Sequence, residues 1–298
     1  MLHRFIFALV LLQSLTYSRG QNISPAYEGW EQMPDGSRYF VFGYMNRNWE
    51  EEIDVPIGSA NSFNIGGDDQ GQPTHFLPRR NRFVFRVAVP KGFTEKDELI
   101  WTLTSHGKTE KAYASLRQDY VLDDVVKASE TGALGAGSSS PEVRANRPPG
   151  LRVDGTRLRT VKVGQPLVLV ANVEDDGIPK RRAGGGGAGA GAGAIARLAT
   201  APPTRITVGK NLGLHLSWFV YRGEGKVSFD PPQVKVWEDT RTGTNSPWAP
   251  LWTPDPIPAD GNITTRVIFN QPGTYILRCR ADDGALTTDQ EITVTVTP

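Results

Sequence analysis

Residues 272–296 read PGTYILRCRADDGALTTDQEITVTV, and this stretch decides the fold class of the chain. Apolar and polar side chains alternate on both sides of the Asp283-Gly284 pair. A period of two is typical of a β-strand with one buried face. Asp-Gly is a turn signal, because Asp accepts bonds from its own backbone and Gly tolerates positive φ. The stretch therefore predicts a β-hairpin that packs on a core through one face.

One face of this predicted hairpin is apolar and the other is polar. The apolar face consists of Tyr275, Leu277, Cys279, Ala281, Ile292, Val294 and Val296, and the polar face of Ile276, Arg278, Arg280, Thr293, Thr295 and Thr297. The threonines suit a solvated sheet face, because they are β-branched and polar. The single cysteine of the chain, Cys279, lies on the inward face. We interpret it as a small buried apolar residue, since a catalytic thiol needs exposure and a neighbouring base.

Short strands separated by turns recur along the whole chain, which indicates an all-β protein of two β-sandwich domains. Strands are predicted at residues 37–46, 51–57, 81–89, 99–105, 108–116, 160–163, 165–174, 212–220, 226–229, 234–237 and 264–269. We expect residues 51–57 to pair with residues 37–46. The segments 99–105 and 108–116 flank His106-Gly107 and predict a second hairpin.

Composition divides the chain into segments. Residues 1–20 combine a basic head, an apolar run of about a dozen residues and small residues near Gly20, a pattern typical of a cleaved secretory signal peptide. An uncleaved anchor is the alternative, but the run is short for about 30 Å of hydrocarbon. We predict a first domain at 25–129, a Gly/Ser/Pro linker at 130–150 and a second domain at 151–298, interrupted by a disordered Gly/Ala insertion at about 178–205.

The charge balance argues against two classes of partner. The chain carries 33 basic and 32 acidic residues, and loss of residues 1–20 removes Arg4 and Arg19, which leaves 31 against 32, or −1. This balance gives no reason to expect nucleic acid or an anionic membrane as a partner. The predicted signal peptide indicates a secreted, periplasmic or cell-surface protein. We expect its partner to be a protein or a glycan at the cell surface.

The second predicted domain resembles the PKD-like and related immunoglobulin-like modules of bacterial secreted proteins. The resemblance rests on VEDDG (173–177), Trp218, PGTYILRCRADDG (272–284) and the TVTV strand that follows. It implies an immunoglobulin-like sandwich with Trp218 on the third strand, facing a sixth strand that bears Tyr275. Such modules are generally non-catalytic spacers or interaction modules. The first domain, through DQGQPTHFLP (69–78) and WTLT (101–104), resembles the amino-terminal part of uncharacterised secreted bacterial proteins.

Carboxylates cluster in three predicted loops of the second domain. An immunoglobulin topology brings the B–C, D–E and F–G loops to one end of the sandwich. These loops carry Glu174, Asp175, Asp176, Asp260, Asp282 and Asp283. Ca²⁺ takes six to eight oxygen ligands, so the cluster is a candidate calcium site and the only cofactor site the sequence suggests. The alternative, which the pattern favours, is that Asp-Gly pairs simply form turns.

Aromatic residues provide a second candidate site. Trp248 and Trp252 lie in a long Pro-containing loop, and Trp30, Tyr39, Tyr44 and Trp49 lie in the first domain. Flat rings on a β-sandwich can stack on sugars or anchor a protein, although core packing explains most such residues. Trp248 and Trp252 are therefore candidate ligand-binding residues.

Catalytic motifs do not appear in the sequence. There is no GxSxG, HExxH or CxxC spacing, and no carboxylate pair stands out. We interpret His75, in a Pro-containing loop near Asp68, Asp69 and Arg79, as solvated. The sequence predicts a non-catalytic exported binding or structural module. The alternatives are a carbohydrate-binding or carbohydrate-acting protein and a calcium-dependent adhesion module.

Overall fold

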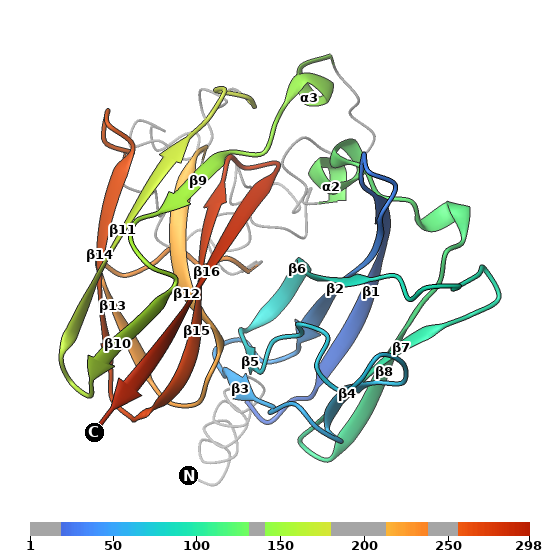
Figure 1. Ribbon diagram of the computed structural model, residues 1–298, viewed down its shortest axis with the longest axis horizontal. Coiled ribbons are helices and arrows are strands. Elements are labelled where there is room, and N and C mark those ends of the chain that lie inside the picture. Colours follow the sequence, from blue (N-terminus) through green and yellow to red (C-terminus); the bar gives the residue numbers. More distant parts are fainter. Residues whose placement is uncertain (1–18, 131–140, 180–212, 238–255) are drawn as a thin grey trace, which may run out of the picture. The chain divides into compact units, whose positions relative to one another are not determined.

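The computed structural model of the chain describes residues 19–130, 141–179, 213–237 and 256–298 (Figure 1). The chain forms two compact units, Met1–Val121 and Leu122–Pro298. Both are built from β-sheets in which most neighbouring strands are antiparallel, so the predicted all-β class is confirmed. The domain boundaries expected from the sequence stay a prediction, and residues 1–18 of the expected signal peptide lie outside the described ranges. In the described ranges, no helix has the length and apolar character needed to span a membrane.

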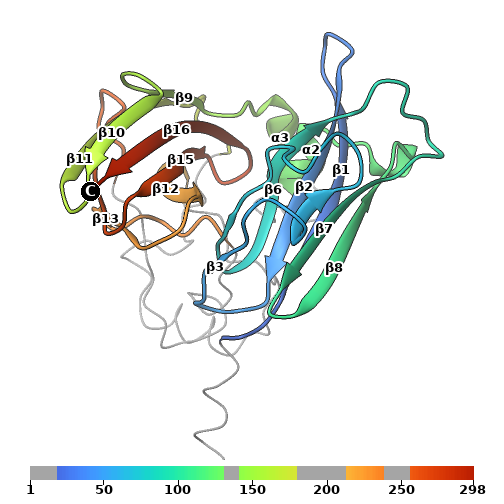
Figure 2. The same cartoon turned by 60° about the horizontal axis from the view of Figure 1, so that its bottom comes forward.

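Residues 19–121 of the first unit form two three-stranded sheets and a short two-stranded ladder. The sheets have the orders β1-β2-β6 and β4-β7-β8, and the ladder joins β3 to β5. The strands are β1 (Ile23–Gln32), β2 (Arg38–Asn46), β3 (Ile53–Asp54), β4 (Asn61–Phe63), β5 (His75–Phe76), β6 (Arg79–Ala88), β7 (Leu99–Ser105) and β8 (Lys108–Ala114), followed by the 3₁₀ turn η2 (Gln118–Tyr120). Figure 2 shows the long strands β1 and β2 running beside each other.

Aromatic rings fill the core of the first unit. Trp101 is fully buried, and its ring meets Phe85 edge-on at 5.0 Å and stacks on Phe63 at 6.1 Å between centroids. Phe42 packs against both Phe85 and Trp101. These rings come from both three-stranded sheets, because β2 and β6 carry Phe42 and Phe85 while β4 and β7 carry Phe63 and Trp101. Each ring pair contributes about 0.5–1.5 kcal/mol beyond the burial of its area.

Two predictions about pairing in the first unit have different outcomes. The hairpin around His106 and Gly107 is confirmed, because β7 and β8 pair up to Ser105 and Lys108 and both turn residues have positive φ. The pairing of residues 51–57 with 37–46 is wrong, since β2 lies between β1 and β6. The sequence pattern predicted no strand at β1. Pro25 and a bulge near Gly29 interrupt the alternation of apolar and polar side chains in this segment.

In its described residues, the second unit is a sandwich of two four-stranded sheets. Their orders are β13-β14-β11-β9 and β10-β16-β15-β12. The strands are β9 (Gly150–Val153), β10 (Leu158–Lys162), β11 (Pro166–Glu174), β12 (His215–Arg222), β13 (Val227–Asp230), β14 (Asn262–Phe269), β15 (Gly273–Asp282) and β16 (Thr287–Thr297). Two short helices precede them, α2 (Asp124–Glu130) and α3 (Pro141–Ala145).

The strand order of the second unit is that of an immunoglobulin-like domain. With β9 as strand A and β11 to β16 as strands B to G, one sheet has the order D-E-B-A and the other contains C-F-G, as in the constant-type fold. The strand β10 adds to the second sheet by pairing in parallel with β16. Tyr275 lies near the start of strand F and donates its hydroxyl to the carbonyls of Gln271 at 3.1 Å and Glu224 at 2.6 Å. This contact corresponds to the tyrosine corner of such domains.

The predicted inward face of the closing hairpin is confirmed. Tyr275, Leu277 and Cys279 are fully buried, in one cluster with Trp218 of strand C. Trp218 thus occupies the position expected from the immunoglobulin resemblance. The predicted strand 234–237 is wrong, because these residues follow β13 without strand geometry.

The expected solvation of the hairpin's polar face is wrong for its arginines. Arg278 and Arg280 are only 6% and 7% exposed. Their cross-strand partners are carboxylates, with Arg278 Nε 2.9 Å from Glu291 Oε1 and Arg280 Nε 2.8 Å from Asp289 Oδ1. The Arg278 guanidinium also lies over the Tyr221 ring at 3.5 Å. The register therefore supplies the counter-charges that allow these side chains to leave water.

The thiol of Cys279 is expected to be unreactive in the folded chain. The residue is fully buried, and burial raises the pKa of the thiol, so almost no thiolate is present at neutral pH. We expect a disulfide reagent such as dithionitrobenzoate to react at least about a thousandfold more slowly in native buffer than in denaturant. Because the chain has one cysteine, the signal has one source. Prompt reaction in native buffer would contradict the buried placement.

Candidate functional site

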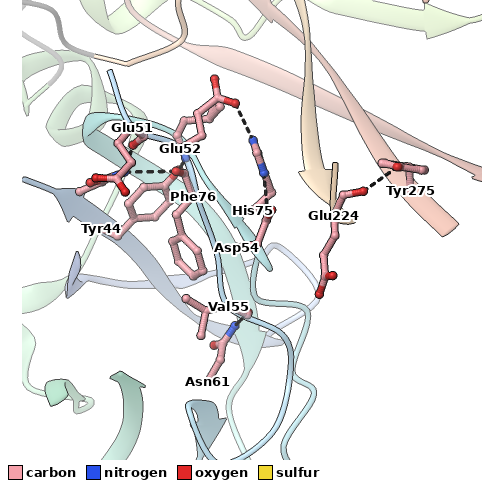
Figure 3. Close-up of polar contacts among 12 residues, drawn as sticks. Tyr44, Glu51, Glu52, Asp54, Val55, Asn61, His75, Phe76, Glu224 and Tyr275 are labelled. Atoms are coloured by element: carbon pink, nitrogen blue, oxygen red, sulfur yellow. Dashed lines mark hydrogen bonds and ion pairs between the residues drawn. The ribbon is translucent and has the colours of Figure 1, made fainter. Parts of the chain in front are cut away.

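A buried histidine of the first unit, His75, lies between two carboxylates. The short ladder of β3 and β5 pairs Asp54 with His75 across the strands. His75 Nδ1 is 2.7 Å from Asp54 Oδ1, and His75 Nε2 is 3.1 Å from Glu52 Oε2. Figure 3 shows the imidazole bridging these two acids. His75 is 7% exposed, so the sequence interpretation of a solvated loop histidine is wrong.

The two carboxylates determine the charge of the ring. Burial alone opposes protonation of His75, but the hydrogen bonds and charges of Asp54 and Glu52 outweigh it and raise the pKa of His75 to about 9. At neutral pH the ring is a cation, and both nitrogens donate. Neither nitrogen has a lone pair for a metal ion or for proton abstraction. The arrangement therefore acts as an internal ion cluster that joins β3 to β5.

Buried amides hold the backbone around this cluster. Asn46 donates to the carbonyls of Glu51 at 2.8 Å and Phe76 at 3.2 Å. Asn61 is fully buried and donates to the carbonyls of Val55 at 3.0 Å and Pro73 at 2.9 Å. Each amide thus ties the segment containing β3 to the segment containing β5, and Figure 3 shows Asn61 beside Val55.

The acidic B–C and D–E loops use their carboxylates in local turns. Asp175 and Asp176 accept from the backbone N–H groups of Gly177 and Ile178 at 2.8 and 2.9 Å. Asp260 is exposed and bonds both the backbone and the side chain of Asn262 at 3.1 Å. The side chain of Glu174 is exposed at the end of β11. These contacts are those of ordinary Asx turns, the alternative that the sequence pattern favoured.

The acidic F–G turn is buried, in contrast to the other two loops. Asp282 Oδ1 accepts from the backbone of Gly284 at 2.7 Å, and Asp283 Oδ1 accepts from the backbone of Ala285 and Leu286 at 2.6 and 2.7 Å. Burial raises the pKa of Asp283 to about 6 despite these bonds. His215, on the neighbouring strand, places Nε2 4.0 Å from Asp282 Oδ2.

The structure brings only parts of the predicted calcium site together. Asn172 donates to the carbonyl of Asp260 at 2.9 Å, which joins strand B to the D–E loop. The backbone of Arg147 contacts Asp176, and Asn146 contacts Asp283. Within the ranges that the structure describes, no three His, Cys, Asp or Glu side chains are arranged to hold a metal ion. Calcium binding by these six acids stays a prediction of the sequence alone.

A calcium titration tests this prediction directly. We expect millimolar Ca²⁺ to release no heat in calorimetry on the full chain and to leave its melting temperature unchanged. The reason is that Asp175, Asp176, Asp260, Asp282 and Asp283 already accept hydrogen bonds within the chain, which a cation would have to displace. Mg²⁺ serves as the matched control for ionic strength. Saturable heat with Ca²⁺ alone would establish the calcium-dependent alternative.

The aromatic candidates have mixed outcomes. Trp248 and Trp252 lie outside the described residues, so their role as ligand-binding residues stays a prediction. Trp30 and Tyr44 are 6% and 2% exposed and belong to the core of the first unit. The Trp49 ring is covered by the guanidinium of Arg79 at 3.8 Å. Core packing and a local cation contact thus account for these three rings.

Comparisons with known proteins give only weak likenesses. No protein-family model matches the chain, and no curated protein is similar to it in sequence. An I-band fragment from titin aligns over 92% of this chain with 9% identity and a TM-score of 0.23, and the chain spans 64% of that fragment. The D00-D0 domain of intimin aligns over 92% of this chain and 100% of its own length, with 9% identity and a TM-score of 0.24. Domains 4 and 5 of the S-layer protein SbsC give 8% identity, coverages of 93% and 98%, and a TM-score of 0.22. The immunoglobulin-like assignment therefore rests on strand order and register.

Proposed function

We propose that the protein is an exported, non-catalytic binding or structural module that presents loops on rigid β-sandwiches. The second unit is PKD-like in this proposal, on the strength of its PGTYILRCRADDG strand and Trp218. Its partner is a protein or a glycan at the cell surface, in the periplasm or in the medium. A leader at residues 1–20 accounts for export.

The main support is the state of the reactive side chains in the described ranges. His75 is a cation between two carboxylates, Cys279 is buried, and Arg278 and Arg280 are paired with Glu291 and Asp289. General-base and nucleophilic catalysis need a group with a free lone pair within reach of a substrate. These groups instead stabilise the two sandwiches, which suits a scaffold whose exposed loops carry the function.

A combined binding and turnover experiment tests the proposal. The full chain is immobilised and exposed to insoluble polysaccharides and to purified cell-surface proteins of its source. We expect saturable retention of one partner class and no chemical change in it. His75→Gln is the matched variant, because it removes the buried histidine that lies between Asp54 and Glu52. Product formation by the unaltered chain that disappears in His75→Gln would replace the binding function with an enzymatic one.

A second measurement tests export. We expect the protein recovered outside the cytoplasm to begin near Gln21, as intact mass spectrometry would show. Retention of residues 1–20 in the recovered protein would favour the uncleaved anchor.

A further inference from the structure

The turn between strands F and G of the second unit is covered by a segment that precedes the sandwich. In an immunoglobulin-like domain this turn belongs to the end where loops meet solvent. Here Ala285 and Leu286 are only 2% and 4% exposed. Both pack against Ala128 of α2, which is 1% exposed, and Val125 lies at the margin of the contact. The helix α2 therefore covers the F–G turn.

A second contact is made by Asn146 and Arg147, which lie just before strand A. They bond the acidic loops at the end of the sandwich that carries the F–G turn. The side chain of Asn146 donates from Nδ2 to Asp283 Oδ2 at 3.2 Å, and the backbone N–H of Arg147 donates to Asp176 Oδ2 at 3.2 Å. Asn146 is 7% exposed, yet its Oδ1 has no hydrogen-bond partner. A buried acceptor without a partner costs about 1–3 kcal/mol, so this contact is imperfectly satisfied.

The covering segment is weakly held in comparison with the sandwich. The helix α2 has seven residues and α3 has five, and helices of this length are unstable without tertiary packing. Among the described residues, the apolar part of this contact consists of Ala128 and Val125 against Ala285 and Leu286, whereas the sandwich core buries Trp218, Tyr275 and the other residues of its cluster. Segments with few buried apolar contacts open at a lower free energy than core strands.

We propose that α2, together with Asn146 and Arg147, forms a detachable cap over the loop end of the second unit. Opening of the cap exposes Ala285 and Leu286 beside the carboxylates of Asp176 and Asp283 while the sandwich stays folded. The biological use of this device rests on the proposed binding function, because a covered loop end cannot contact a partner. The opening itself does not depend on that function.

Hydrogen exchange on the full chain, measured by mass spectrometry without any partner, tests the cap. We expect the amides of α2 and of residues 284–286 to exchange together, at least about tenfold faster than those of β15 and β16. Ala128→Arg should raise exchange at both sites by about another tenfold and leave β15 and β16 unchanged, because it places a charge in the contact. Val126→Arg is the matched control, since Val126 is 37% exposed on the same helix.

Two outcomes would overturn the cap. In the first, α2 and residues 284–286 exchange at the rate of β15 and β16 in the unaltered chain. In the second, Ala128→Arg also raises exchange in β15 and β16, which would make α2 an integral part of the sandwich. Asn146→Ala provides a second variant that keeps the apolar contact, and it should raise exchange at residues 284–286 without affecting β15. Because no partner is used, these results stand apart from the test of binding.

Discussion

Replacing Asn61 by Leu is expected to lower the free energy of unfolding of the first unit by about 4 kcal/mol. Asn61 is fully buried and its amide makes three hydrogen bonds. Its Oδ1 accepts from Trp101 Nε1 at 3.0 Å, and its Nδ2 donates to the carbonyls of Val55 and Pro73. Leucine has a similar volume but leaves all three partners unsatisfied, at about 1–3 kcal/mol each. A loss of this size is a large share of the stability of an ordinary domain.

The measurement must report on the first unit alone, because a chain with two units need not unfold in one step. Hydrogen exchange of peptides from β2 and β7 provides this, since their slowest amides open with the whole unit. Asn64→Leu is the matched control: Asn64 is exposed and bonds Glu98 and Ile100, so water can replace its amide. We expect a loss below about 1 kcal/mol there. Equal effects at the two positions would show that Asn61 is not buried in solution.

The stability of the first unit is expected to fall by up to about 3 kcal/mol between pH 6.5 and pH 9 through His75. The pKa of His75 is about 9 in the folded chain, above the ordinary value of 6.5. The folded state therefore holds this proton more tightly than the unfolded state. The stabilisation is complete below pH 6.5 and is lost as the pH rises through 9. Salt should reduce it, because Glu52 is half exposed.

His75→Gln isolates this contribution. The variant should be less stable than the unaltered chain at pH 6, and the difference between the two should shrink as the pH rises to 9 and become constant above it. The control is His106→Asn, which removes an exposed histidine and creates an Asn-Gly pair that suits the two-residue turn with positive φ. Its profile should keep the fall of the unaltered chain. A pH-independent difference for His75→Gln would mean that the ring is neutral at pH 6 and that the ion cluster does not form.

The closing hairpin shows what the alternation of apolar and polar residues can predict and what it cannot. Alternation with a period of two identified the inward face of β15 and β16, and with it the burial of Cys279, because the side-chain direction in a strand depends on sequence position alone. The same pattern could not show that Arg278 and Arg280 are buried. Their burial depends on Glu291 and Asp289 lying opposite them, which is a matter of register between strands.

The cluster of His75, Asp54 and Glu52 could not be predicted from the sequence. Its partners Asp54 and Glu52 lie 21 and 23 residues away, and β3 and β5 have two residues each. Segments this short have no period to detect, so the sequence offered no signal for the pairing. The cap over the F–G turn could not be predicted either. Asn146 and Asp283 are 137 residues apart, and no local pattern links them.

The sequence by itself determined the all-β class and the inward face of the closing hairpin, which includes Tyr275 and Cys279. These follow from alternation and turn chemistry, which act over a few residues. Only the tertiary structure decided which carboxylates meet His75, which counter-ions allow two arginines to leave water, and which segment covers the acidic turn. Those features depend on long-range contacts whose free energy exists only once the chain has folded.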